Sequence, residues 1–215
     1  MIQTLLSTLL FLLPATGDPP HTTGCRILAP ASYPWTPVKA HSGETWLALF
    51  ETDSGYELRT TRLLVSYSDG TGNAGIPEWN VTTADRSSKP LIILDPGGSA
   101  LREGEVDGVL VHSPVMLPGD EIDLGGYGLL RADPKGLWLS DGDDRQRLCG
   151  VYPDSRGEEV TVVWAGDLDG DGLIDLVLND RSHYALVFRY RLFLSSEAYP
   201  GELVREVAST DAAAC

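Results

Sequence analysis

Positive charge is scarce in this sequence. It has 16 Lys and Arg residues against 31 Asp and Glu residues, which gives a formal net charge of −15 over 215 residues. Because such a chain repels phosphate backbones and anionic lipid headgroups, nucleic acid and membrane surfaces are poor partners for it. The excess of carboxylates also supplies oxygen ligands for hard cations. The composition leaves a protein or a glycan as partner, and it leaves the oligomeric state open.

Cysteine is also rare, and Cys25, Cys149 and Cys215 lie far apart in the chain. This spacing excludes paired-cysteine zinc knuckles and C-x-x-C redox motifs. An exported chain could form one disulfide, and we expect Cys25 to pair with Cys215, because Cys149 lies in a strand-like segment where a small buried thiol is common. The Thr-Thr-Gly-Cys sequence ending at Cys25 is similar to a lipid-attachment box, but the apolar run before it ends at Leu13, which disfavours lipidation.

Long apolar runs are confined to the start of the chain, at residues 5–13. A nine-residue helix rises only about 14 Å and cannot cross a bilayer core of about 30 Å, so we expect no transmembrane segment. Pro14 and small residues follow, as they do at a cleavage site, although no Lys or Arg precedes Arg26. Residues 1–17 are therefore predicted to be a signal peptide, and the mature protein is expected to be secreted or periplasmic.

The sequence also lacks sustained apolar stripes of helical period, so we expect few and short helices. Short apolar runs alternate instead with Asp- and Gly-rich turns, such as residues 53–55, 95–98 and 141–143. A spacing of about ten residues between such runs is typical of an antiparallel sandwich or barrel, and the predicted fold is therefore mainly β. The expected strands are residues 45–50, 56–67, 91–94, 106–111, 127–131, 137–139, 146–151, 160–164, 173–178, 184–194 and 202–207.

Proline separates the N-terminal part of the mature chain from the rest. Residues 18–43 are rich in Pro, Thr and Ser and are predicted to run extended as an arm over the surface. Residues 44–215 are predicted to form a single β-rich domain, because a chain of this length can bury one substantial core.

One segment carries a recognisable site chemistry, and it reads Asp167-Leu-Asp-Gly-Asp-Gly-Leu-Ile-Asp175. Carboxylates fall at positions one, three, five and nine, so a chain curled around a cation would direct alternate side chains inward. Glycine at position six relieves the bend that lets the carbonyl at position seven join the ligands. The predicted ligands are Asp167, Asp169, Asp171, the Leu173 carbonyl and Asp175, and hard oxygen ligands of this kind favour Ca²⁺.

An EF-hand differs from this segment in two respects. Its loop ends in a bidentate Glu at position twelve, where this chain has Leu178, and helices flank it, whereas the flanks here are apolar and β-branched. We therefore predict a strand-loop-strand calcium site. The alternative is an acidic hairpin without a metal.

The surrounding run, Trp164-Ala-Gly-Asp-Leu-Asp-Gly-Asp-Gly-Leu-Ile-Asp-Leu-Val-Leu178, resembles the calcium loop of FG-GAP/VCBS-type repeats, which occur in integrin-like β-propellers and in many secreted bacterial proteins. The resemblance implies the same ligands at residues 167, 169, 171, 173 and 175. A propeller would contain several copies, and the chain has no second Asp-x-Asp-x-Asp-Gly, so we expect a single loop outside a propeller. The layout of the whole chain is similar to secreted bacterial proteins with one such loop near the C-terminus, which implies a location in the bacterial envelope and no particular activity.

Several enzyme signatures are missing, namely Gly-x-Ser-x-Gly, His-Glu-x-x-His and a phosphate-binding glycine loop. Four carboxylates and a carbonyl would nearly saturate a calcium ion, so we expect a structural ion in a non-catalytic binding or envelope protein. The alternative is an exported hydrolase that uses carboxylates or His183, which follows the loop. Among the tryptophans, residues 46, 138 and 164 are expected in the core, and Trp79 is the best candidate for an exposed aromatic contact.

Overall fold

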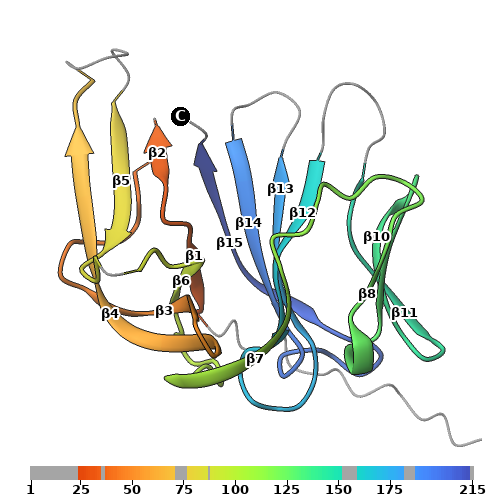
Figure 1. Ribbon diagram of the computed structural model, residues 1–215. Helices are drawn as coiled ribbons and strands as arrows, with labels where there is room; N and C mark the ends of the chain where they lie inside the picture. Colours follow the sequence, from red (N-terminus) through yellow and green to blue (C-terminus); the bar gives the residue numbers. More distant parts are fainter. Residues whose placement is uncertain are drawn as a thin grey trace, which may run out of the picture.

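The computed structural model describes residues 24–34, 37–70, 77–86, 88–151, 159–181 and 187–213. This part of the chain is built from β-strands and one 3-10 turn, η1 (Gly125–Tyr127), which confirms the mainly β prediction (Figure 1). The described residues contain no helix long and apolar enough to cross a membrane. The strands are β1 (Arg26–Leu28), β2 (Ser32–Pro34), β3 (Thr45–Thr52), β4 (Gly55–Ser68), β5 (Glu78–Thr83), β6 (Ile92–Asp95), β7 (Gly104–Val111), β8 (Glu121–Asp123), β9 (Leu129–Asp133), β10 (Gly136–Asp141), β11 (Asp144–Cys149), β12 (Glu159–Asp167), β13 (Asp175–Arg181), β14 (Val187–Leu194) and β15 (Arg205–Ala213).

The larger sheet has 11 strands in the order β1-β6-β3-β4-β5-β2-β15-β14-β13-β12-β7. An additional pairing between β7 and β4 closes part of it into a ring, so that the sheet is barrel-like. β4 makes this closure possible because it is 14 residues long. Its first part pairs with β3 and β7, and its last part, Leu63–Ser68, pairs with β5. Every pairing is antiparallel, as the short turns between the apolar runs predict.

A smaller four-stranded sheet, in the order β11-β10-β9-β8, lies beside β12–β14 at the right of Figure 1. The two sheets enclose the small-sheet cluster, a set of buried residues that includes Leu130, Leu137, Val160, Val162 and Leu178. The opposite side of β12–β14 contributes to the central cluster, which includes Leu49, Leu58, Ile92, Trp164, Val177 and Leu192. A third cluster, with Tyr33, Trp46, Phe50 and Val81, fills the space around β2, β3 and β5.

β12 contributes buried residues on both of its faces, which explains why all of residues 160–164 except Thr161 are apolar. Val160 and Val162 belong to the small-sheet cluster, whereas Val163 and Trp164 belong to the central cluster. Val163 and Trp164 are consecutive and yet share one side of the strand, because a register shift lies between Val162 and Trp164 in the β12–β13 ladder. Burying one such aliphatic side chain contributes about 1.5–3 kcal/mol to the free energy of folding. The buried residues of β12 therefore stabilise the packing on both sides of the strand.

The expected N-terminal arm contributes two short strands to the larger sheet. β1 pairs with β6, and β2 lies between β5 and β15. Tyr33 of β2 is buried, and its hydroxyl donates to Ala29 O at 3.0 Å and accepts from Ala29 N at 2.8 Å. The predicted signal peptide, residues 1–17, lies outside the described residues.

Candidate metal centre

The predicted calcium loop joins two adjacent antiparallel strands. β12 ends at Asp167 and β13 begins at Asp175, and Gly166 pairs with Asp175 in the ladder between the strands. The loop lies at the lower end of both strands in Figure 1. Its two ends are therefore fixed by the central strands of the core, and the segment has the strand-loop-strand form that the apolar flanks predict.

Three of the predicted ligand residues come together. Asp167, Asp169 and Asp175 each offer a carboxylate oxygen, and these oxygens lie within 4.8 Å of one another. The exposed fraction is 0% for Asp175 and 9% for Asp167, and Asp169 is partly buried. Three carboxylates at this separation, two of them removed from water, form an acidic cluster that could hold a metal ion.

The other two predicted ligands lie on the exposed side of the loop. Asp171 Oδ1 accepts a hydrogen bond from Leu173 N at 2.8 Å, and the Leu173 side chain is 56% exposed. The structure thus brings three of the five predicted residues together. Asp171 lies beside them, and its carboxylate accepts hydrogen bonds from Leu173 N and Ser195 Oγ.

The Asp167 carboxylate organises the backbone of the loop. Its Oδ1 accepts hydrogen bonds from Gly170 N at 2.7 Å and Asp171 N at 3.1 Å, and its Oδ2 accepts one from Gly172 N at 2.9 Å. Gly170 and Gly172 have φ angles of 81° and 83°, a region that residues with a Cβ enter only at a cost. The positive φ at Gly172 agrees with the bend predicted at position six.

Two serines from the end of β14 complete the surroundings of the loop. Ser195 donates to Asp175 Oδ1 through its backbone N at 2.8 Å and through its Oγ at 2.9 Å, and Ser196 Oγ donates to Asp169 Oδ2. Leu168 N donates to the other oxygen of Asp175 at 2.8 Å. The sequence carried no signal for these serines, because the β13–β14 pairing alone brings them to a loop that ends 20 residues before Ser195.

Burial makes ionised carboxylates costly at this site. Burial first, and then the negative charge of Asp169, raise the pKa of Asp175 to about 7, while hydrogen bonds from Ser195 and Leu168 act in the opposite direction. Burial also raises the pKa of Asp169. A cation bound among these carboxylates would remove the cost of ionising them near neutral pH.

The small sheet and β7 both reach the neighbourhood of the loop. Tyr127, in η1, has a raised pKa, caused first by burial and then by the negative charges of Asp167, Asp107 and Asp175. Asp107 lies on β7, directly opposite Asp167 in the β7–β12 ladder. The negative charges of the loop and of β7 therefore both act on Tyr127, which lies beside the small sheet.

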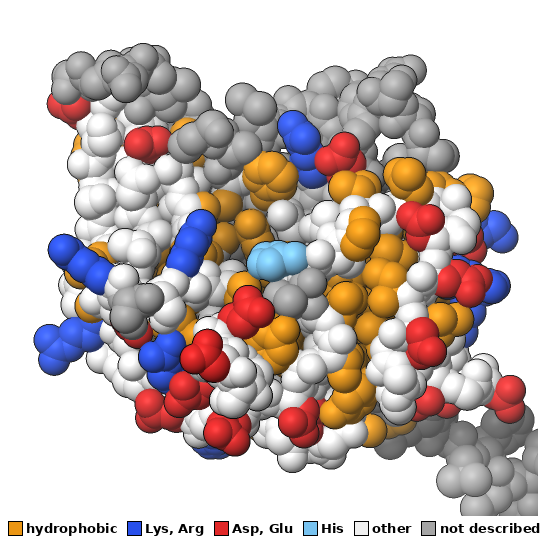
Figure 2. Space-filling view, in the orientation of Figure 1, with side chains coloured by type: hydrophobic (Ala, Val, Ile, Leu, Met, Phe, Trp, Pro, Cys, Tyr) orange, Lys and Arg blue, Asp and Glu red, His pale blue; other side chains and the backbone are white. Residues whose placement is uncertain are grey.

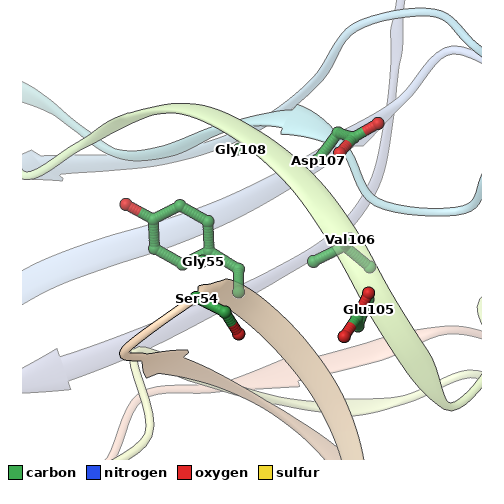
Figure 3. A pocket seen from close by; sticks show the side chains of 7 residues that line it. Ser54, Gly55, Glu105, Val106, Asp107 and Gly108 are labelled. Atoms are coloured by element: carbon green, nitrogen blue, oxygen red, sulfur yellow. The ribbon is translucent and has the colours of Figure 1, made fainter.

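An open pocket of about 180 Å³ lies beside this region, between the β3–β4 turn at residues 54–56 and residues 105–108 of β7. Acidic side chains gather in this part of the surface, in the lower half of the view in Figure 2. Within the pocket, the carboxylates of Glu105 and Asp107 point in different directions and do not face each other (Figure 3).

The tryptophans follow the expected distribution in part. Trp46 and Trp164 are buried, as predicted. Trp138 is only partly buried, and the guanidinium of Arg145 lies 4.1 Å from the centre of its ring. Trp79 is also partly buried and packs against Tyr67, with ring centres 5.0 Å apart and ring planes tilted by 48°.

Two predictions fall on residues that the structure does not describe. His183, proposed as an acid or base in the hydrolase alternative, lies outside the described residues. Cys215 does so too, and the Cys25–Cys215 disulfide stays a prediction. Cys25 and Cys149 are both buried, in the central cluster and the small-sheet cluster respectively.

The donor set of the loop fits a hard cation. The converging side chains of Asp167, Asp169 and Asp175 offer only oxygen, and oxygen ligands suit calcium, magnesium or manganese rather than zinc or copper. Comparison with known proteins yields no match to this chain among family models, curated proteins or solved structures.

Proposed function

We propose that this chain is an exported calcium-binding β-domain in which the loop at residues 167–175, of the FG-GAP/VCBS kind, binds one structural Ca²⁺. The observation that carries the proposal is the convergence of Asp167, Asp169 and Asp175 within 4.8 Å around a carboxylate that has no exposure to solvent. A buried anionic cluster of this kind is expensive without a cation, which supports metal binding over an ordinary acidic hairpin.

Calcium suits this loop better than magnesium. Magnesium demands near-octahedral geometry and short bonds, whereas calcium accepts six to eight oxygens in an irregular arrangement. Asp167, Asp169 and Asp175 would supply carboxylate oxygens, with Asp171, the Leu173 carbonyl and water as the further ligands. Bound there, the ion neutralises the aspartates and fastens the β12–β13 connection.

A structural role fits the position of the loop in the fold. Asp167 and Asp175 belong to strands whose neighbouring residues, such as Trp164 and Leu176, are fully buried in the core. Four carboxylates and a backbone carbonyl would nearly fill the coordination shell of the ion and leave little room for a substrate on it. The domain would then bind a protein or a glycan through another surface, or serve the bacterial envelope, after export to the periplasm or the medium.

The proposal is tested by titrating calcium into the chelator-treated full chain, with isothermal titration calorimetry and thermal melting as readouts. Asp169→Asn removes one partly buried carboxylate of the cluster, and Asp143→Asn removes an exposed carboxylate in the β10–β11 turn. We expect the wild type and Asp143→Asn to bind one calcium ion and Asp169→Asn to bind it much more weakly. Calcium at about a hundred times its dissociation constant should stabilise the wild type by about 2.7 kcal/mol. A wild-type chain with no heat of binding and an unchanged melting temperature would refute the proposal.

A further inference from the structure

We propose that Ser195, at the end of β14, is a positioning residue of the metal site, whose hydroxyl holds the carboxylates of Asp171 and Asp175 in the arrangement that receives the cation. This inference rests on the proposed calcium-binding function. It extends the site to a residue that lies 20 positions after Asp175 and outside the loop.

The Ser195 hydroxyl lies between two carboxylates. Its Oγ is 2.9 Å from Asp175 Oδ1, and it is 3.0 Å and 3.2 Å from Oδ2 and Oδ1 of Asp171. A hydroxyl carries one proton, so it donates to one of these carboxylates at a time, and the other faces a lone pair of the same oxygen. A cation close to the three groups stabilises that arrangement, because it attracts both carboxylates and the hydroxyl oxygen.

The fold fixes the place of this hydroxyl. Leu176 pairs with Phe193 in the β13–β14 ladder, so Ser195 lies across from the start of β13, and its backbone N donates to Asp175 Oδ1 at 2.8 Å. The exposed fraction of Ser195 is 6%, so water has little access to replace the hydroxyl. Hydrogen bonds in such surroundings are stronger than they are in water, and they restrict the carboxylates that accept them.

Ser196 offers a natural comparison in the next position. Its Oγ donates to one carboxylate, that of Asp169, and the residue is exposed. Water can therefore take over the role of the Ser196 hydroxyl, but it cannot easily take over that of Ser195. The two serines should differ sharply in their effect on calcium binding.

The first measurement is the calcium dissociation constant of the chelator-treated full chain by isothermal titration calorimetry. We expect Ser195→Ala to weaken binding about 10- to 100-fold, as is usual when a hydrogen-bond partner of a ligating carboxylate is lost, and Ser196→Ala to weaken it far less. Ser113→Ala is the control for a purely structural loss, because Ser113 is also buried and its Oγ bonds to Val162 N and Pro114 O, away from the loop. It should lower the melting temperature and leave the dissociation constant unchanged.

A second measurement separates positioning from general destabilisation. Terbium replaces calcium in the site, and its luminescence lifetimes in light and heavy water report the number of coordinated water molecules. We expect more coordinated water in Ser195→Ala than in the wild type, because Asp171 is no longer held, and no change in Ser113→Ala. If Ser195→Ala does not fold, Ser195→Cys keeps the side-chain size with a weak donor and is measured in the same way.

The outcomes distinguish this inference from the function on which it rests. A wild-type chain that binds no calcium overturns the proposed function. A wild type that binds calcium, with a Ser195 variant of equal affinity and equal water count, overturns the role of Ser195 alone. A Ser195 variant that behaves as Ser113→Ala does, with lower stability and unchanged affinity, overturns it as well.

Discussion

At the scale of single residues, Asp175 shows the conflict between burial and charge most clearly. Its carboxylate is fully buried, and three donors from Leu168 and Ser195 compensate part of the lost hydration. The compensation is incomplete, because the pKa of Asp175 is still raised to about 7. Without a cation, and at pH values between the ordinary pKa of 3.8 and the folded pKa of about 7, the folded protein therefore keeps a proton on Asp175 that the unfolded chain has released.

This difference predicts how the metal-free protein responds to pH. A folded pKa of about 7 against an ordinary value of 3.8 means that the stability gained from the proton at Asp175 is fully present below about pH 4 and is lost as pH rises towards 7. The loss is at most on the order of 4 kcal/mol. Urea unfolding of chelator-treated protein at pH 5 and pH 8 measures the part of this loss that falls between these two pH values, and Asp175→Asn should flatten the difference between them. Equal pH dependence in the wild type and the variant would contradict this view of Asp175.

The predictable ligand residues are those whose position in the site follows from the spacing of residues within the loop itself. The alternation of Asp167 and Asp169 and the later Asp175 follow from the geometry of a chain that curls on itself, and the structure brings these three together. Ser195 was not predictable, because its contact depends on the pairing of β13 with β14. Asp107 comes near the loop only through the β7–β12 ladder, which local sequence does not specify.

At the scale of elements, the apolar runs correctly predicted most of the strands, whereas short or polar strands were not predicted. β12 was predicted from Val160 to Trp164 because it is buried on both faces. β5 was missed, since Val81 and Thr83 are its only buried residues and polar residues surround them. β2 and β8 have three residues each, too few to show a period. Their place in the sheets is set by pairing with distant segments.

The contact between β7 and β12 depends on glycine. A Cβ added to Gly166 would lie 2.0 Å from the backbone O of Asp107 and 2.7 Å from Gly108 Cα. Because backbone cannot yield as a flexible side chain does, Gly166→Ala should force β7 away from β12 and lower the free energy of unfolding by about 1–3 kcal/mol or more. It should also weaken calcium binding, since Asp167 is the next residue.

Denaturant unfolding and calcium titration of the Gly166→Ala variant test this expectation. Gly126→Ala serves as the control, because a Cβ at Gly126 meets no atom within 4 Å and its φ is not positive. A Gly166→Ala variant as stable as Gly126→Ala would show that the β7–β12 contact tolerates a wider spacing.

At the scale of the whole molecule, β12–β14 join the two halves of the fold. They supply residues to the small-sheet cluster on one side and to the central cluster on the other. The ring closes where β4 meets β7, and there Tyr56 packs edge-on against Trp164, with ring centres 6.2 Å apart. The regular spacing of the short apolar runs predicted a sandwich or barrel, but this closure joins segments far apart in the chain and could not be inferred from their local patterns.

Because the central strands are shared, an ion at the end of β12 and β13 should stabilise the small sheet as well as the loop. Cys149 in β11 reports on that sheet, since it is buried and burial raises the pKa of its thiol to about 12. A thiol with that pKa is almost entirely protonated at pH 8 and reacts only after the protein opens. We therefore expect iodoacetamide to modify Cys149 slowly in calcium-loaded protein and markedly faster after chelation, as followed by peptide mass spectrometry. Equal rates in concentrated urea would control for the intrinsic reactivity of the thiol. If chelation lowers the melting temperature while the Cys149 rate in native buffer stays the same, the ion holds only its own loop, and the two halves of the fold open independently.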